Sequence, residues 1–365
     1  MRAEPFRPVI TSRQLLYLLI AATMPTQDLL LPGPLIKAFG KDALWAIMVG
    51  GILAVVPLLL ALYILRRQRR GPFGAAFGRH LFVARVIAAL LAMAAALGFG
   101  NIFASLTQML HVDLLEFTPA WVTTYLAAFV AIYASLGGPE VVGRVAELLV
   151  PIVLIEASML FGLALPWLNP IYMLPLTPQD GLALTLGAYQ AFTFLGEVGF
   201  AIYFGSLVRD PEGIARALWT ALGVNVLMLL LTTGMPLLMF GTEHSSILAA
   251  PTVTAVRSIH YGFLIERLDS LMTAPWAAFV VLKIIVWTTF ASGLLGDVFG
   301  HRAYRPAVWV LILVASYASL RLRDLGAVET SVKALWYESG APLLMLTLVL
   351  AAAFLRWQRR RPARA

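Results

Sequence analysis

The chain lacks cysteine and has few charged residues for its length. None of its 365 residues is Cys, and 13% are Asp, Glu, Lys or Arg, whereas soluble domains carry about 25% charged residues. Without Cys, disulfides, thiolate metal sites and cysteine nucleophiles are excluded. The five His residues are scattered, and no metalloprotease, hydrolase, Walker or dinucleotide-binding motif occurs in a suitable setting. The sequence therefore predicts no enzyme, metal or cofactor.

Hydrophobic residues dominate what is present. They make up 60% of the chain, and the mean hydropathy is +0.85. Ten apolar segments of about 14–30 residues occur, and a bilayer-crossing helix needs about 17–25 residues. We predict an all-α polytopic membrane protein with one transmembrane domain over residues 1–365. The ten predicted spans cover residues 14–39, 43–65, 81–110, 121–136, 141–165, 182–207, 214–240, 269–295, 307–320 and 341–355.

Positive charge is distributed as in proteins that follow the topology rule. The net charge is +8, but the basic residues lie at the ends of spans and form no single face, so we predict no nucleic-acid partner. With a cytoplasmic N-terminus, 19 Lys and Arg residues fall inside and seven outside, while Lys283 lies within a span. This excess predicts that both termini are cytoplasmic. The first span exceeds a signal-peptide core and lacks a cleavage site, so we expect it to be retained.

Span six carries a carboxylate and two glycines in the middle of an apolar segment, in the run Thr193-Phe194-Leu195-Gly196-Glu197-Val198-Gly199. A charged side chain at the bilayer centre costs at least about 2.5 kcal/mol, which makes it a functional candidate. The glycines favour a helix break, whose freed backbone groups can line a cavity. We therefore predict a discontinuous helix that places four residues at a central ligand site: Thr193, Phe194, Gly196 and Glu197.

Span one carries a second polar interruption, Met24-Pro25-Thr26-Gln27-Asp28, about 10–14 residues from its start. At 1.5 Å per residue this is about 15–21 Å into the span, near the midplane. Proline removes a helix hydrogen bond and disfavours helix at the residue before it. We predict a break here that brings four more residues to the central site: Pro25, Thr26, Gln27 and Asp28.

The two interruptions occupy matching places in the chain. Each opens a group of five spans, and an odd number of spans inverts the second group relative to the first. Secondary transporters built from inverted repeats follow this pattern, and their ligand site lies where the two broken helices meet. We predict a five-plus-five inverted repeat with broken helices 1 and 6, in which the repeats cover about residues 12–165 and 180–356.

Further polar residues lie within apolar spans. Lys283, in span eight, needs a carboxylate partner if buried, and Glu197 and Asp28 are the candidates. Lys283 and Glu156 are assigned an ion-coupling or structural role, with a proton relay open for Glu156. Asn101, in span three, is a candidate lining residue. Glu197 has three open roles: binding a ligand amine, carrying a proton, or pairing with a lysine.

Two expectations concern the ends of spans. Arg144 and Glu147, three residues apart at the start of span five, are expected to form a surface pair. Residues 252–260 have helical spacing of apolar residues but are too polar to span a membrane. They form either a short helix across the outer mouth or a surface loop.

Several stretches resemble the spore germination permeases, the B subunits of germinant receptors. The most specific is Phe263-Leu264-Ile265-Glu266-Arg267-Leu268-Asp269-Ser270-Leu271, followed by Val281-Leu282-Lys283. The others are Thr11-Ser12-Arg13-Gln14-Leu15, the segment from Arg144 to Pro151, Phe192 to Glu197, and Ala250-Pro251-Thr252. This resemblance covers about residues 11–300. It implies the amino acid–polyamine–organocation transporter superfamily, whose fold is a five-plus-five inverted repeat.

The resemblance also implies a function. It indicates a membrane-embedded subunit of a nutrient germinant receptor in the spore inner membrane, which binds a small amino acid or amine and triggers germination. The implied partners are a larger membrane subunit and a lipoprotein. In this superfamily a lysine ammonium can stand where related proteins bind sodium, which is one hypothesis for Lys283; the alternative is a snorkelling lysine or a structural pair. The alternatives are an active permease of amino acids or amines coupled to protons or a cation, and a scaffold with a vestigial pocket.

Span one departs from the superfamily pattern. The break there usually carries small residues whose bare backbone holds a carboxylate, but the run Met24-Pro25-Thr26-Gln27-Asp28 contains no glycine. Asp28 would repel a carboxylate and attract an amine, which disfavours an L-alanine-like ligand. The sequence leaves open the ligand, the coupling ion and the protonation of Glu197.

Overall fold

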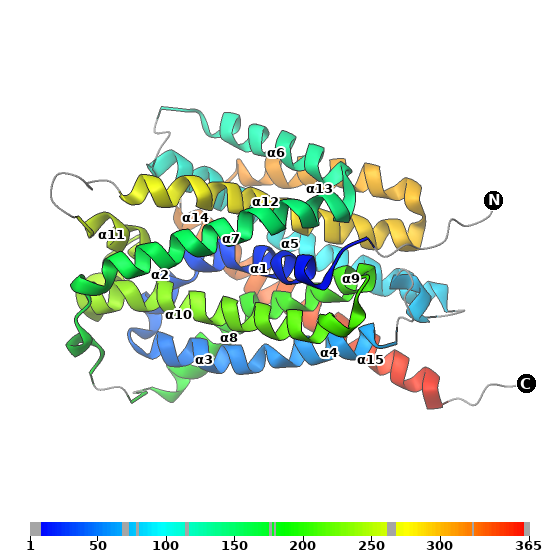
Figure 1. Cartoon of the computed structure of the whole chain (residues 1–365), viewed down its shortest axis with the longest axis horizontal. Coiled ribbons are helices and arrows are strands. Elements are labelled where there is room, and N and C mark those ends of the chain that lie inside the picture. The colour runs from blue at the N-terminus through cyan, green and yellow to red at the C-terminus, as the bar shows by residue number, and fades with distance from the viewer. Residues whose placement is uncertain are drawn as a thin grey trace, which may run out of the picture.

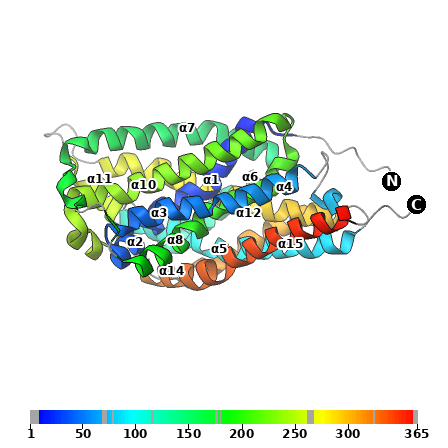
Figure 2. The same ribbon diagram turned by 90° about the horizontal axis from the view of Figure 1, so that it is seen from below.

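The computed structural model describes residues 9–67, 73–77, 80–113, 117–174, 177–178, 180–260, 268–322 and 325–360. Within these residues every regular element is a helix, and one isolated β-bridge joins Ile10 to Val208. The long helices lie side by side along the longest axis of the molecule (Figure 1, Figure 2). Both chain ends lie at the same end of this bundle (Figure 1), as an even number of spans requires.

The first half of the chain contains the first five predicted spans. Span one is α1 followed by α2, span two is α3 followed by α4, and spans three to five are α5, α6 and α7. The bounds are α1 (Ser12–Leu30), α2 (Pro32–Phe39), α3 (Asp42–Leu53), α4 (Val55–Leu65), η1 (Phe73–Phe77), α5 (Leu81–Asp113), α6 (Ala120–Leu136), α7 (Gly138–Ala164), η2 (Leu165–Trp167) and η3 (Pro170–Met173).

The second half contains the other five. Span six runs from α8 to η5, spans seven to nine are α10, α12 and α13, and span ten runs from α14 to α15. The bounds are α8 (Gly181–Leu195), η4 (Gly196–Phe200), α9 (Ala201–Phe204), η5 (Gly205–Leu207), η6 (Pro211–Gly213), α10 (Ile214–Ile247), α11 (Pro251–Ser258), α12 (Leu268–Phe299), η7 (His301–Ala303), α13 (Tyr304–Ser319), α14 (Leu325–Ser331), η8 (Val332–Gly340) and α15 (Ala341–Arg360).

Length and hydropathy alone identify fewer spans than ten. Among the described residues six helices are long and apolar enough to cross a membrane, and α1 with α2 makes a seventh bent by 50°. The remaining predicted spans are short or divided, since α6 has 17 residues, α13 has 16 and span six changes winding at Gly196. All ten predicted spans thus correspond to a helix or an interrupted helix. The proposed repeat boundaries stay a prediction.

The break in span one does not lie where the sequence predicted it. Helix α1 continues through Pro25 and ends at Leu30, and the 50° bend falls between Asp28 and Pro32. Proline is favoured in the first turn of a helix, so Pro32 begins α2 instead of breaking α1. The segment from Met24 to Asp28 is therefore helical, and its side chains point in different directions.

Span six changes its winding and does not unwind. Helix α8 ends at Leu195 and continues as the 3₁₀ helix η4, in which all five residues are buried. Gly199 permits a close approach here, because a Cβ atom at this position would lie 2.8 Å from the Leu348 Cδ1 atom of α15. The glycine thus serves helix packing.

Span ten begins earlier than predicted. The helical segment extends from Gly326 to Gln358, so Lys333, which precedes the predicted start of span ten at residue 341, lies in the π-helical segment η8. The segment was missed because it is amphipathic, with Lys333 and Glu338 exposed and Val332, Trp336 and Tyr337 buried.

The polar ends of the helices show why α1 begins where it does. Thr11 caps α1 in a capping box with Gln14. The predicted pair of Arg144 with Glu147 is wrong: Glu147 accepts from Arg13 and Gln14, and Arg144 instead pairs with Glu140 at 2.8 Å. A carboxylate four residues before the cation is a favoured arrangement on a helix.

Helix α12 lies at the centre of the bundle. In the apolar stretch of its span, 83% of the residues are buried inside the protein, against 22% in the span that contains α7. Helix α12 packs against α1, α5, α6, α7 and α13. The alternative of a helix at residues 252–260 is confirmed by α11. This helix lies at the end of the bundle opposite the chain termini (Figure 1).

Candidate functional site

Side chains of α12 supply hydrogen bonds to the part of α1 that contains Pro25. Proline has no N–H, so the helix loses the hydrogen bond that residue 25 would otherwise donate to the Ala21 carbonyl. Three carbonyl oxygens of α1 accept from α12: Ala22 from Trp287 Nε1 and Pro25 from Trp276 Nε1, both at 2.9 Å, and Thr23 from Lys283 Nζ at 3.3 Å. These bonds tie the stretch of α1 around Pro25 to α12, and α1 continues through Pro25.

Lys283 and Glu197 form a buried ion pair. Lys283 Nζ lies 2.9 Å from Glu197 Oε2, and each side chain is 1% exposed. The same nitrogen donates to Thr26 Oγ1 at 2.6 Å and to the Thr23 carbonyl at 3.3 Å. An ammonium has three protons to donate, so the three contacts use all of them. The pair joins α1, η4 and α12 at one point.

A cavity with an empty volume of about 250 Å³ adjoins this ion pair, and we refer to it as the central cavity. Spans one, three, six, eight and ten contribute to its walls. The lining residues are Thr26, Leu30, Gly98, Asn101, Ile102, Phe194, Glu197, Lys283, Trp287, Val332 and Trp336. The two predicted interrupted spans therefore meet at this cavity, through Thr26 and Glu197.

Two nitrogen donors of the central cavity have no partner. Asn101 Nδ2 and Trp336 Nε1 are buried without a hydrogen bond to any described residue, whereas Asn101 Oδ1 accepts from Ser331 Oγ at 2.7 Å. A buried donor without an acceptor costs about 1–3 kcal/mol. A bound group with an acceptor oxygen would remove this cost at both nitrogens.

Aromatic rings form the rest of the wall. The Trp287 and Trp336 rings lie 5.1 Å apart between centroids. Both need Gly98 of α5, since a Cβ atom there would lie 2.8 Å from the Trp287 ring and 3.0 Å from the Trp336 ring. Lys283 Nζ lies 5.0 Å from the Trp287 centroid and 5.9 Å from that of Phe194, within the range of cation–π attraction.

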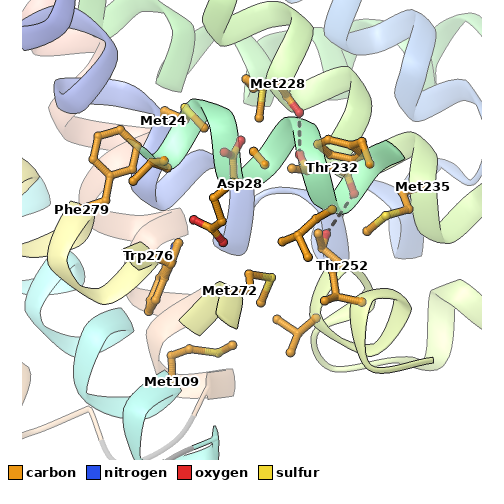
Figure 3. Close-up of a pocket in the computed structure, with 17 residues that line it drawn as sticks. Met24, Asp28, Met109, Met228, Thr232, Met235, Thr252, Met272, Trp276 and Phe279 are labelled. Atoms are coloured by element: carbon orange, nitrogen blue, oxygen red, sulfur yellow. Dashed lines mark hydrogen bonds between the residues drawn. The ribbon is translucent and has the colours of Figure 1, made fainter. Parts of the chain in front are cut away.

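The structure brings together only part of the predicted site. Five predicted residues line the central cavity: Thr26, Asn101, Phe194, Glu197 and Lys283. Others face elsewhere: Gln27 Nε2 donates to the Asn225 carbonyl of α10 at 2.9 Å, and Thr193 and Gly196 line a small pocket facing α15. Pro25 contributes its carbonyl to Trp276. Asp28 and Glu156 line a separate, larger cavity (Figure 3).

Helix geometry explains this separation. Successive helical residues are about 100° apart around the axis, so Thr26 and Asp28 point about 200° apart. The prediction treated Pro25 to Asp28 as unwound backbone whose side chains face one site. Since α1 stays helical there, Asp28 does not line the central cavity, and its expected repulsion of a carboxylate in that site does not apply.

Sequence reasoning missed Trp287 and Trp336. Aromatic residues in spans are mostly packing residues, so their type alone carries no signal. The clue for Trp336 is local: it lies in a nine-residue π-helical segment, and π-helical turns occur frequently at functional sites. No pattern in the sequence predicts that turn.

Comparison with known proteins identifies the family. The profile of the family described as "Spore germination protein" matches residues 9–325. Spore germination protein B2 of Bacillus subtilis (strain 168) is 24% identical over 268 residues, which cover 69% of this chain and 68% of that protein. The resembling stretch at residues 263–267 lies outside the described residues.

Solved structures of transporters share the fold. MhsT in complex with L-phenylalanine has a TM-score of 0.68 at 12% identity, over 96% of this chain and 89% of that one. A Na⁺-coupled sialic acid symporter has a TM-score of 0.65 at 14% identity, over 98% and 92%. MHP1, a nucleobase-cation-symport-1 family transporter in a closed conformation, has a TM-score of 0.59 at 12% identity, over 97% and 94%.

These identities establish the fold alone, with which ten spans in two inverted halves are consistent. The family profile, in contrast, covers most of the chain, and the curated relative carries the same family description. The chain therefore belongs to the spore germination protein family, as a membrane protein with the fold of a solute transporter.

Proposed function

We propose that the chain is the membrane-embedded subunit of a nutrient germinant receptor and binds a small amino acid or amine in the central cavity. The observation that carries the proposal is the Lys283–Glu197 ion pair beside two unpartnered nitrogen donors, Asn101 Nδ2 and Trp336 Nε1. Both the family and the fold are those of membrane proteins that recognise solutes. In this proposal the protein lies in the spore inner membrane with both termini in the cytoplasm.

The polar groups of the cavity suit a zwitterion. The carboxylate of an amino acid would accept hydrogen bonds from Asn101 Nδ2 and Trp336 Nε1. Its ammonium would lie among the aromatic faces of Phe194 and Trp287, where cations are attracted. Because Lys283 and Glu197 neutralise each other, the walls carry no net charge that would reject a molecule with one positive and one negative group.

The ion pair also offers a way to transmit binding. It joins α1, η4 and α12, so a ligand that draws either charge away changes how these three elements meet. Lys283 would thereby replace a bound coupling cation and brace α12 against α1. A ligand shifts such an equilibrium only by as much as it binds the two states differently. We propose that the shift is passed to a larger membrane subunit and a lipoprotein.

The test uses Glu197→Gln in spores that carry the complete receptor. The variant keeps the shape of the side chain but removes its charge, so the germinant response should fall at least about tenfold. Glu140→Gln, on α7 and outside the cavity, is the matched control and should respond as the parent does. A full response of Glu197→Gln, at equal protein level, would falsify the central site.

Transport is the competing function, and the fold of the structural relatives belongs to transporters. Purified protein in liposomes distinguishes the two. A receptor binds its germinant without accumulating it, whereas a permease coupled to a proton or cation gradient concentrates its substrate inside the vesicle. Concentrative uptake that is lost in Lys283→Ala would replace the receptor with an active permease.

A further inference from the structure

A second cavity, which we call the side cavity, lies on the other side of α1. Its empty volume, which includes space open to the outside, is about 670 Å³. Helices α1, α5, α7, α10, α11 and α12 form its walls. Figure 3 shows Asp28 pointing into it among Met24, Met228, Met272 and Trp276. The central cavity shares none of its lining residues with this one.

The side cavity contains two carboxylates and no cation. Asp28 comes from α1 and Glu156 from α7, and no Lys, Arg or His is among the described residues that line it. Asp28 Oδ1 is buried and has no hydrogen-bond partner among the described residues. Lys283 cannot supply one, because its three protons are donated to Thr23, Thr26 and Glu197. A buried carboxyl group without a cationic side chain beside it either holds a proton or pairs with the cation of a bound molecule.

The side-chain donors of the described residues in this wall, Thr232, Thr252 and Trp276, all have acceptors in the protein. Thr232 Oγ1 donates to the Met228 carbonyl at 3.0 Å, and Thr252 Oγ1 donates to the Thr232 carbonyl at 2.9 Å (Figure 3). Trp276 Nε1 donates to the Pro25 carbonyl at 2.9 Å. The polar atoms left for a ligand are therefore acceptors, which suits a molecule that brings donors and positive charge.

The apolar part of the wall suits the body of such a molecule. Methionine side chains adapt their shape to different ligands. The side cavity contains five of them: Met24, Met109, Met228, Met235 and Met272. The ring faces of Trp276 and Phe279 also line it, and aromatic faces attract ammonium groups.

We propose that the side cavity binds an organic cation: a primary amine with an apolar or aromatic body, whose ammonium group lies between Asp28 and Glu156. This site is separate from the germinant site of the central cavity and does not depend on it. The occupant competes with protonation, since each acid that takes up a proton loses its attraction for the amine.

The first test measures affinity on the purified full-length chain in lipid nanodiscs by isothermal titration calorimetry. The probe is 2-phenylethylamine, and 2-phenylethanol is its uncharged counterpart. We expect saturable binding of the amine that is at least about tenfold tighter than that of the alcohol, and a loss of at least about tenfold in Asp28→Asn and in Glu156→Gln. Glu140→Gln, on the same helix as Glu156, is the control. Equal affinity for both probes, no binding of the amine, or unchanged binding in both variants would overturn the site.

The second test locates the probe, and the absence of Cys from the chain makes it direct. Val256→Cys places a single thiol in the side cavity, and Val332→Cys places one in the central cavity. We expect 2-phenylethylamine to slow modification of the first thiol by a methanethiosulfonate reagent by at least about fivefold and to leave the second unchanged, since a ligand shields only the site it occupies. Protection of the Val332→Cys thiol instead would place the amine in the central cavity and refute the proposal.

Discussion

The central cavity and the side cavity lie on opposite sides of α1 and have opposite polarity. In the central cavity a buried cation and a buried anion are paired, and the groups left without partners are the donors Asn101 Nδ2 and Trp336 Nε1. In the side cavity two acids belong to the wall, and Asp28 Oδ1 is an acceptor left without a hydrogen bond. Helix α1 lines both cavities, because Thr26 and Asp28, two residues apart, point about 200° apart around the helix axis. Polar residues that are close in the sequence of a helix therefore need not share a site.

The difference also concerns stability. Breaking a buried ion pair leaves one charge without compensation and costs about 3–5 kcal/mol. Neutralising Asp28, whose Oδ1 accepts no hydrogen bond, breaks no ion pair. Substitutions on the two sides of α1 should therefore differ in effect, although the residues concerned are similarly polar and similarly placed in the sequence.

The largest expected effect comes from breaking the ion pair. Lys283→Met should lower the free energy of unfolding by about 3–5 kcal/mol, because Glu197 then stays buried without a cation. The double variant Lys283→Met with Glu197→Gln should recover most of this loss. Thermal and denaturant unfolding of the purified protein in detergent measure both. The exposed Lys37→Met is the control, and a Lys283→Met protein as stable as this control would contradict the expectation.

The next effect concerns the carbonyl groups around Pro25. Trp287→Phe keeps the ring packing but removes the donor to the Ala22 carbonyl, which should cost about 1–3 kcal/mol. Trp276→Phe, on the side-cavity end of the same stretch, should cost a similar amount. Trp219→Phe is the control, since that side chain is 46% exposed. If all three variants unfold alike, the α12 donors do not stabilise α1.

A smaller effect is expected at Asp28. Asp28→Asn removes an acid whose Oδ1 has no partner, so the free energy of unfolding of the unliganded protein should change by less than about 1 kcal/mol. Its comparison with Glu197→Gln, measured in the same assay, is the sharpest test of the difference between the cavities. Equal and large losses in both variants would show that Asp28 has a stabilising partner.

The smallest effect concerns an acid outside the spans. Burial raises the pKa of Asp210, but hydrogen bonds from the hydroxyl and the amide of Ser12 outweigh it and lower that pKa below its ordinary value of 3.8. A lowered pKa contributes stability above the pKa of the unfolded chain, and this contribution is lost as the pH falls through the pKa of the folded protein.

Ser12→Ala removes the hydroxyl donor and should move the pKa of Asp210 back toward 3.8. The parent should then be slightly more stable than the variant above about pH 4, and the difference should vanish at lower pH. Unfolding midpoints of the two proteins between pH 2.5 and 7 provide the measurement. A difference that grows as the pH falls would contradict the assignment.

The spans and the charged residue pair could be predicted from the sequence. Long apolar segments have few alternatives to helices in a bilayer, so ten spans could be counted even though α6 and α13 are short. The cost of a buried charge also made Lys283 and Glu197 conspicuous and required a partner for each. These predictions rest on solvation, which depends on residue type and little on neighbours.

The side-chain directions could not be predicted in the same way. Pro25 predicted a break in α1, but the helix continues through it, and the Pro25 and Ala22 carbonyls accept hydrogen bonds from Trp276 and Trp287, more than two hundred residues later. Lys333 was placed in a loop because a short sequence window does not show which of its neighbours are buried. In both cases, contacts between distant parts of the chain decided the local structure.

By itself, the sequence determined the membrane class, the number of spans and the identity of the buried charges, since hydropathy and desolvation act on each residue separately. Only the tertiary structure decided which charges meet. It paired Lys283 with Glu197 and placed Asp28 in the wall of a different cavity, because the continuity of α1 sets the direction of each side chain and the packing of α12 sets its partners. The division into a donor-lined and an acceptor-lined cavity follows from that geometry.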